Sequence, residues 1–193
     1  MRDIFKRARA LYHLVQWYLG GKPLPPPHAI KVQAIRHYAH IYAARTCIET
    51  GTFHGDTIAA VLSIFDRIIS IELDATLYAR AQQRFKGYSS VTLLNGDSGI
   101  LLPTVLASLQ ETALFWLDGH YSGEGTAHGS LETPILNEVR AILAHPHPQV
   151  ILIDDARLFN GTHDYPTIAE LSAIVGGQYT LFVADDIIRI LPL

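Results

Sequence analysis

Acidic side chains follow five stretches of the sequence that have the apolar character of buried strands. These acids are Glu49, Glu72, Asp97, Asp118 and the adjacent pair Asp154 and Asp155. The carboxyl ends of parallel strands meet at one edge of an open sheet, and ligands bind at that edge. A single acid at a strand end is common, but an acid after each of five strands indicates a shared ligand site.

A glycine-containing turn follows the first of these strands. Gly51 and Gly55 flank three residues, and a helical segment begins directly afterwards. Glycine adopts backbone dihedrals that other residues avoid, so the main chain can approach a ligand closely. The N-terminus of the following helix adds N–H groups that have no partner within the helix. The turn therefore predicts a ligand held by the main chain beside Glu49.

The spacing from this turn to Glu72 indicates what the ligand contains. Glu72 lies 21 positions after Gly51, close to the spacing at which an acid binds a ribose in dinucleotide folds. Phe53 stands where the dinucleotide motif has its middle glycine, and Glu49 would place negative charge beside a pyrophosphate. An adenosine ligand with a cationic part and no phosphate fits better than NAD, and S-adenosylmethionine is such a ligand.

The segments that carry these acids alternate between strand-like and helical patterns. This alternation predicts parallel strands joined by right-handed crossovers, with helices on both faces of the sheet. We expect an α/β, Rossmann-like, doubly wound fold with a mostly parallel seven-stranded sheet and a C-terminal antiparallel hairpin. The expected strands are 46–49, 67–71, 91–95, 113–117, 150–153, 179–184 and 187–191, and the expected helices of this domain are 29–44, 57–64, 75–85, 99–109, 132–144 and 167–175.

The first 27 residues differ in character from the rest of the chain. Residues 2–19 have an apolar stripe at helical spacing with four basic residues in the first half, and a linker rich in glycine and proline follows. The helix packs on the domain or on a second subunit of a homodimer, or it makes a peripheral contact with an anionic membrane. We expect residues 1–27 to be this helix and linker, and residues 28–193 to be the ligand-binding domain.

Composition excludes several classes of function. The chain has 193 residues, a formal net charge of −3 and a single cysteine, Cys47. This charge gives no electrostatic reason to expect nucleic acid as a partner. One cysteine cannot form an intramolecular disulfide and suits a reducing compartment. No apolar run reaches the roughly 18 residues of a membrane span, so we expect a cytoplasmic protein without a transmembrane segment.

Taken in order, three motifs resemble the cofactor site of class I S-adenosylmethionine-dependent methyltransferases. They are Glu49-x-Gly51-x-x-x-Gly55, then Glu72, then Asn95-Gly96-Asp97-Ser98. The resemblance covers roughly residues 30–193 and implies that residues 28–193 are a methyltransferase domain. It also implies that Glu49 and the turn of Gly51, Thr52, Phe53 and Gly55 hold the methionine part of the cofactor. Glu72 would bind the ribose, and Asp97 with Ser98 would flank the adenine.

The second half of the chain resembles the macrocin O-methyltransferase-like group, in which some members depend on magnesium. The motifs are Trp116-Leu117-Asp118-Gly119-His120-Tyr121 and the run that ends in Asp154-Asp155. The resemblance implies that Asp118, Asp154 and Asp155 bind Mg²⁺. His120 replaces the usual second acid of the group, so His120 and Asp118 are both candidate general bases. Alternatively, one acid of the 154–155 pair caps a helix or pairs with Arg157.

The resemblance implies an S-adenosylmethionine-dependent methyltransferase that acts on a hydroxyl of a small molecule, such as a sugar or a glycosylated product. Residues 159–165 are a candidate wall of the acceptor pocket, and the glycine-containing loop 122–130 is a candidate lid. Two alternatives stay open, a cofactor-binding module without catalysis and an NAD-dependent Rossmann enzyme. The acidic cluster argues against the first, because cofactor binding alone does not need it.

Overall fold

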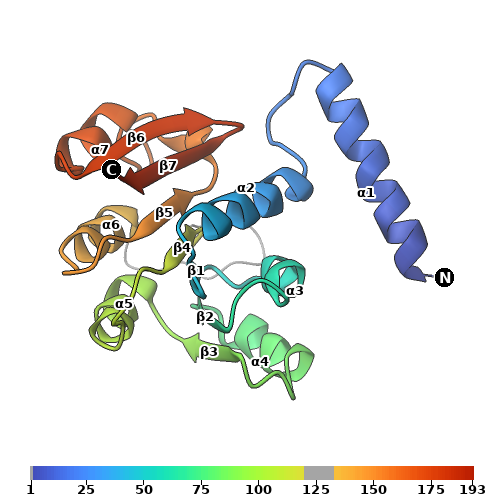
Figure 1. The fold of residues 1–193 in the computed structure, drawn as a ribbon, viewed down its shortest axis with the longest axis horizontal. Coiled ribbons are helices and arrows are strands. Elements are labelled where there is room, and N and C mark those ends of the chain that lie inside the picture. The colour runs from blue at the N-terminus through green and yellow to red at the C-terminus, as the bar shows by residue number, and fades with distance from the viewer. Residues whose placement is uncertain (1, 120–132) are drawn as a thin grey trace.

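The computed structural model describes residues 2–119 and 133–193, and side chains within residues 2–8 and at position 10 are outside this description. His120 and the loop 122–130 therefore lie outside the described residues. Figure 1 shows a central sheet with helices on both faces and the first helix, α1 (Arg2–Leu19), standing to one side.

The sheet has seven strands in the order β3-β2-β1-β4-β5-β7-β6. Strands β1 to β5 run parallel to one another, and β7 is antiparallel to both β5 and β6. This arrangement confirms the expected doubly wound sheet with a closing hairpin. The strand order reverses between β1 and β4, which makes that crevice the topological switch point. The strands are β1 (Thr46–Thr50), β2 (Arg67–Glu72), β3 (Val91–Asn95), β4 (Leu114–Leu117), β5 (Val150–Ile153), β6 (Tyr179–Ala184) and β7 (Ile187–Pro192).

Helices cover both faces of the sheet. One face carries α2 (His28–Ile41), α3 (Asp56–Val61) and α4 (Ala75–Arg84), and the other carries α5 (Ser98–Ala107), α6 (Ile135–Leu143) and α7 (Ile168–Ile174). A 3₁₀ turn, η1 (Ala156–Leu158), follows β5.

Several helices are shorter than expected. Helix α2 ends at Ile41 rather than at position 44, because Ala43 adopts a φ of 49° that a right-handed helix does not contain. Helix α3 ends at Val61 rather than at position 64. Helix α6 begins at Ile135, directly after Pro134, which is its N-terminal cap residue. These differences shift element ends but leave the order of elements as expected.

The hydrophobic core lies in two layers, one on each side of the sheet. Neighbouring residues of a strand point to opposite faces, so Cys47 packs with α2 to α4 whereas Ile48 packs with α5 to α7. In β4, Phe115 and Trp116 are both fully buried, one in each layer. Because both faces are covered, the central strands are apolar throughout rather than alternating, as is usual for parallel sheets.

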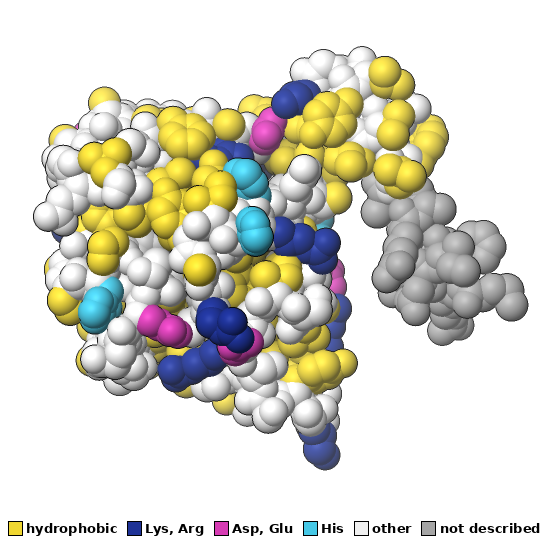
Figure 2. All heavy atoms as spheres, viewed as in Figure 1, with side chains coloured by type: hydrophobic (Ala, Val, Ile, Leu, Met, Phe, Trp, Pro, Cys, Tyr) yellow, Lys and Arg dark blue, Asp and Glu magenta, His cyan; other side chains and the backbone are white. Residues whose placement is uncertain are grey.

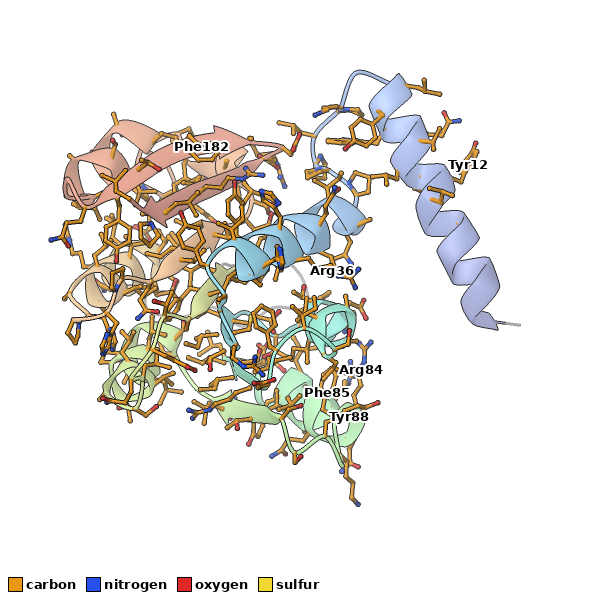
Figure 3. The ribbon with its side chains drawn as sticks, in the orientation of Figure 1. Tyr12, Arg36, Arg84, Phe85, Tyr88 and Phe182 are labelled. Carbon is orange, nitrogen blue, oxygen red and sulfur yellow. The ribbon has the colours of Figure 1, made fainter. Side chains whose placement is uncertain are left out.

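Helix α1 and its linker pack on each other, and the linker contacts the turn between β6 and β7. The Trp17 side chain is buried and its Nε1 donates a hydrogen bond to the Pro23 carbonyl at 2.7 Å. Lys22 Nζ lies 3.0 Å from Asp185 Oδ1, at the turn between β6 and β7. The C-terminal half of α1 leaves apolar side chains exposed (Figure 2), and Tyr12 points away from the sheet (Figure 3). Among the described residues, no helix combines the length and apolarity needed to cross a membrane.

Candidate functional site

The turn after β1 packs directly against the end of β4. Gly51 has a φ of +86°, and its N–H donates to the Ile71 carbonyl at 2.9 Å. A Cβ at this position would lie 2.4 Å from the Asp118 carbonyl oxygen. Only glycine therefore allows this approach, which places the predicted cofactor turn at the switch point beside Asp118.

The Glu72 carboxylate is held in a fixed orientation by the main chain. Its Oε2 accepts the Phe53 N–H at 2.7 Å, and its Oε1 accepts the Asp74 N–H at 2.9 Å. Phe53 has a φ of +47°, an uncommon conformation for a non-glycine residue and one that clusters at functional sites. Each carboxylate oxygen keeps a further lone pair for a ligand. The turn and the second strand thus present one oriented carboxylate, as the 21-residue spacing predicts.

Glu49 lies buried behind this turn, among polar side chains. The Ser70 hydroxyl donates to Glu49 Oε2 at 2.5 Å, and Ser70 Oγ lies 2.6 Å from Thr52 Oγ1. Burial raises the pKa of Glu49 to about 8; the Ser70 hydrogen bond opposes this shift, and the nearby Glu72 charge adds to it. The hydroxyl of Thr52 thus supports Glu49 through Ser70. Sequence reasoning missed Ser70, whose signal is a polar residue inside an otherwise apolar strand.

Asp97 and Ser98 lie at the end of the neighbouring strand, β3. The Asp97 carboxylate accepts the Gly99 N–H at 2.8 Å and caps helix α5, and the Ser98 side chain is buried. Asn95 donates from Nδ2 to the Glu72 carbonyl at 2.8 Å, which ties the ends of β3 and β2 together. The structure thus brings the predicted ribose and adenine residues to adjacent strand ends.

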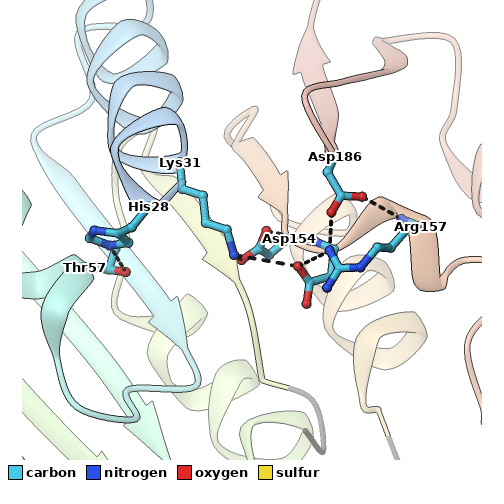
Figure 4. A network of polar contacts seen from close by, with 7 residues as sticks. His28, Lys31, Thr57, Asp154, Arg157 and Asp186 are labelled. Atoms are coloured by element: carbon cyan, nitrogen blue, oxygen red, sulfur yellow. Dashed lines mark hydrogen bonds and ion pairs between the residues drawn. The ribbon is translucent and has the colours of Figure 1, made fainter. Parts of the chain in front are cut away.

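The acid pair after β5 is engaged by two cations (Figure 4). Lys31 of α2 forms an ion pair with Asp154 and lies 3.7 Å from Asp155 Oδ1. Arg157 donates to Asp155 Oδ1 at 2.8 Å and also pairs with the buried carboxylate of Asp186. The ion pair with Arg157, an alternative considered from the sequence, is therefore present. Lys31 is a partner that sequence reasoning missed.

The electrostatics of this pair favour the charged form of Lys31. Burial raises the pKa of Asp154, and the adjacent Lys31 ammonium opposes that shift. Burial alone would lower the pKa of Lys31, but the Asp154 charge outweighs it and raises the pKa, with smaller contributions from Asp118 and Asp155. Lys31 is therefore a cation near neutral pH.

The donor set at these acids does not fit the expected magnesium ion. Within residues 2–119 and 133–193, no three His, Cys, Asp or Glu side chains are grouped so that they could hold a metal. Mg²⁺ needs carboxylate oxygens in direct contact with near-octahedral geometry, whereas Asp154 Oδ2 faces Lys31 and Asp154 Oδ1 accepts the Asp155 N–H at 2.8 Å. Asp118 is half-buried at the end of β4, where its N–H donates to the Thr50 carbonyl at 3.0 Å.

A small pocket, with a cavity volume of about 10 Å³, lies beside Asp154. Its walls include Gly119 after β4, Glu138 of α6, and both Phe159 and Tyr165 from the segment that the sequence predicted to line a pocket. The predicted lid and His120, which follow Gly119 in the chain, lie outside the described residues.

Glu138 is the most unusual residue of this pocket. Its side chain is buried, and burial raises its pKa to about 7, while a hydrogen bond from Ser98 opposes the shift. Its Oε1 has no hydrogen-bond partner among the described residues. Sequence reasoning missed Glu138, although it occupies a position of the apolar stripe of α6, together with Ile135, Val139 and Ile142. A charged residue on the buried face of a helix was the available signal.

Comparisons with known proteins identify the fold. No model of a known protein family matches the sequence, and no curated protein matches it either.

Solved structures do match. A Staphylococcus aureus protein assigned as a caffeoyl-CoA O-methyltransferase superposes with a TM-score of 0.62 at 13% identity, over 99% of this chain and 96% of that one. The methyltransferase PaMTH1 of Podospora anserina, solved with S-adenosylhomocysteine, gives a TM-score of 0.61 at 16% identity, over 95% and 87% of the two chains. The O-methyltransferase TomG of Streptomyces achromogenes, solved with S-adenosylmethionine, gives 0.58 at 13% identity, over 95% and 88%. The chain therefore has the fold of the class I S-adenosylmethionine-dependent methyltransferases.

Proposed function

We propose that the protein is an S-adenosylmethionine-dependent methyltransferase that methylates a hydroxyl of a small molecule, with sugars and glycosylated products as the expected acceptor class. The observation that carries the proposal is the Glu72 carboxylate, oriented by two main-chain N–H groups beside the glycine turn at the switch point. The structural similarity to methyltransferases solved with this cofactor or its product supports the same choice of ligand.

The cofactor roles follow from the position and charge of each group. In our proposal, Glu72 accepts hydrogen bonds from the ribose hydroxyls, and Asp97 with Ser98 flanks the adenine. Glu49 pairs with the ammonium of the methionine part, while the main chain of residues 51–55, including Thr52 and Phe53, encloses that part. No residue of this set needs to contact phosphate, which suits a ligand without one.

Methyl transfer requires the protein to position the acceptor and to remove one proton from its hydroxyl. The acceptor oxygen attacks the methyl carbon in line with the sulfonium sulfur, and holding the two reactants in line supplies roughly 7 kcal/mol or more in good cases. We assign the acceptor hydroxyl to the carboxyl ends of β4 and β5, beside Gly119 and Asp154. Asp118 is the proposed base among the described residues, and His120 remains the alternative base predicted from the sequence. No step of this proposal passes through a metal.

Calorimetry with S-adenosylhomocysteine tests the cofactor assignment. Glu72→Ala removes the acceptor of both ribose hydroxyls, so binding should weaken by roughly 1.5–3 kcal/mol, or about ten- to 150-fold, as for hydrogen bonds to charged groups. Glu111→Ala is the matched control, because Glu111 accepts a hydrogen bond from Thr46 at the opposite end of β1. Thermal melts verify that both variants are folded.

Two results would contradict the proposal. The first is wild-type protein that does not bind the ligand, and the second is a folded Glu72→Ala variant with unchanged affinity. NAD, titrated in parallel, should not bind; saturable NAD binding would favour the dehydrogenase alternative instead.

A further inference from the structure

Lys31 places a positive charge where the sequence resemblance expects a divalent cation. It extends from the first turn of α2 to the acid pair at the end of β5 (Figure 4). Its Nζ pairs with Asp154 Oδ2 and lies 3.7 Å from Asp155 Oδ1. The Asp154 side chain is fully buried, whereas the Lys31 side chain is 18% exposed. The ammonium is thus anchored on a buried carboxylate and still reaches solvent-accessible space.

Arg157 occupies the other side of the same acid pair. It bridges Asp155 and Asp186, and the Asp186 carboxylate is 1% exposed. Arg157 therefore anchors Asp155 from the side of the β6–β7 turn, while Lys31 approaches from α2. Lys31 and Arg157 compensate part of the negative charge of Asp154, Asp155 and Asp186. A metal ion would have to displace the Lys31 ammonium to reach Asp154 Oδ2.

The first turn of α2 joins the two halves of the proposed site. His28 Nε2 lies 3.3 Å from Thr57 Oγ1 in α3, the helix that begins directly after the cofactor turn. One turn later on the same helix, Lys31 contacts the end of β5, beside the proposed acceptor site. Stability alone is a weak reason for this contact, because buried ion pairs contribute little net stability compared with apolar residues of similar size.

We propose that the Lys31 ammonium is the resident cation of the acceptor site and takes the place of a divalent metal. This inference rests on the proposed function. An ammonium has three N–H donors; Asp154 takes up one, and another binds the acceptor oxygen. During transfer the O–CH₃ bond forms, the S–CH₃ bond breaks with its electron pair left on sulfur, and the hydroxyl proton passes to Asp118. Lys31 balances the negative charge on the oxygen during this step.

Metal binding distinguishes a resident ammonium from a vacant metal site. Mn²⁺ is added to the full-length protein, and the loss of the electron paramagnetic resonance signal of free Mn²⁺ reports binding. Wild type should show no saturable binding. Lys31→Met removes the charge at similar length and should create a site for one Mn²⁺ on the vacated aspartates. Lys31→Arg keeps the charge and should not, and Lys86→Met is the matched control at an exposed lysine remote from the acid pair.

Each outcome decides the proposal. Saturable Mn²⁺ binding by wild type overturns it, even if Lys31→Met fails to fold. A folded Lys31→Met that gains no Mn²⁺ site also overturns it, because the aspartates then do not form a cation site that Lys31 fills. Titrating S-adenosylhomocysteine into the same samples keeps the two proposals separate. Absence of cofactor binding refutes the methyltransferase proposal. The Mn²⁺ titration does not require cofactor, so it tests the role of Lys31 as resident cation separately.

Discussion

Cofactor binding should remove a proton from Glu49. Burial raises the pKa of this carboxyl to about 8, so it is mostly protonated at neutral pH in the protein without ligand. The cofactor ammonium that we place against it stabilises the ionised carboxylate. Binding and proton release are therefore coupled, and the affinity for S-adenosylhomocysteine should rise with pH.

The size of the effect follows from the pKa. Ionising Glu49 costs about 1.4 kcal/mol for each pH unit below its pKa. The dissociation constant should therefore fall by about tenfold between pH 6 and pH 7, and the change should become smaller as the pH approaches 8. Calorimetry at pH 6 in two buffers of different ionisation enthalpy should also detect release of close to one proton for each ligand bound.

Substitutions assign the proton to Glu49. Glu49→Gln should bind the ligand more weakly at pH 7.5 and lose the pH dependence, because no carboxyl remains to ionise. Glu111→Gln, at the opposite end of β1, should keep the wild-type pH profile. The reasoning is refuted if wild-type affinity is constant from pH 6 to pH 7.5, or if Glu49→Gln retains the tenfold change.

The raised pKa of Glu49 also makes the free energy of unfolding depend on pH in a defined direction. In the unfolded chain the Glu49 carboxyl has its ordinary pKa of 4.5, whereas in the fold its pKa is about 8. The folded state therefore binds more protons between these values, so the Glu49 contribution lowers the free energy of unfolding as the pH rises through this window. Above about pH 8 the contribution levels off. Glu138, with a pKa of about 7, acts in the same direction.

Two further predictions concern the turn and the first helix. Gly51→Ala should lower the free energy of unfolding by roughly 1–3 kcal/mol from backbone strain alone, and the clash of the added Cβ with the Asp118 carbonyl should lower it further. Urea denaturation measures this loss. Gly177→Ala is the control and should be nearly neutral, because an added Cβ there meets nothing within 4 Å. An equal loss in both variants would contradict the argument. Deleting residues 1–19 should leave a folded domain and convert a homodimer into a monomer in sedimentation, because Leu11, Tyr12 and Val15 of α1 are exposed in the single chain. Monomeric full-length protein that pellets with anionic vesicles would instead favour the membrane contact.

The sequence by itself determined the order of elements, the parallel sheet with its closing hairpin, and the acid at the end of each parallel strand. These features depend on local patterns. A strand covered on both faces is apolar along its length, as at residues 150–153, and the glycines at 51 and 55 mark a turn that other residues would strain. The spacing from Gly51 to Glu72 is also a local pattern, because a single crossover helix joins the two adjacent strands that carry these residues. This spacing therefore predicted that Glu72 lies beside the turn.

Only the tertiary structure decided which charges meet. Lys31 and Asp154 are 123 positions apart, and no local pattern pairs them. Their contact requires α2 to pack on the sheet with its first turn beside the end of β5. Glu138 is likewise buried, with a pKa raised to about 7, because the face of α6 that carries it packs against the core. Pairings of this kind depend on how helices pack across the finished sheet, so they emerge only when distant segments are brought together.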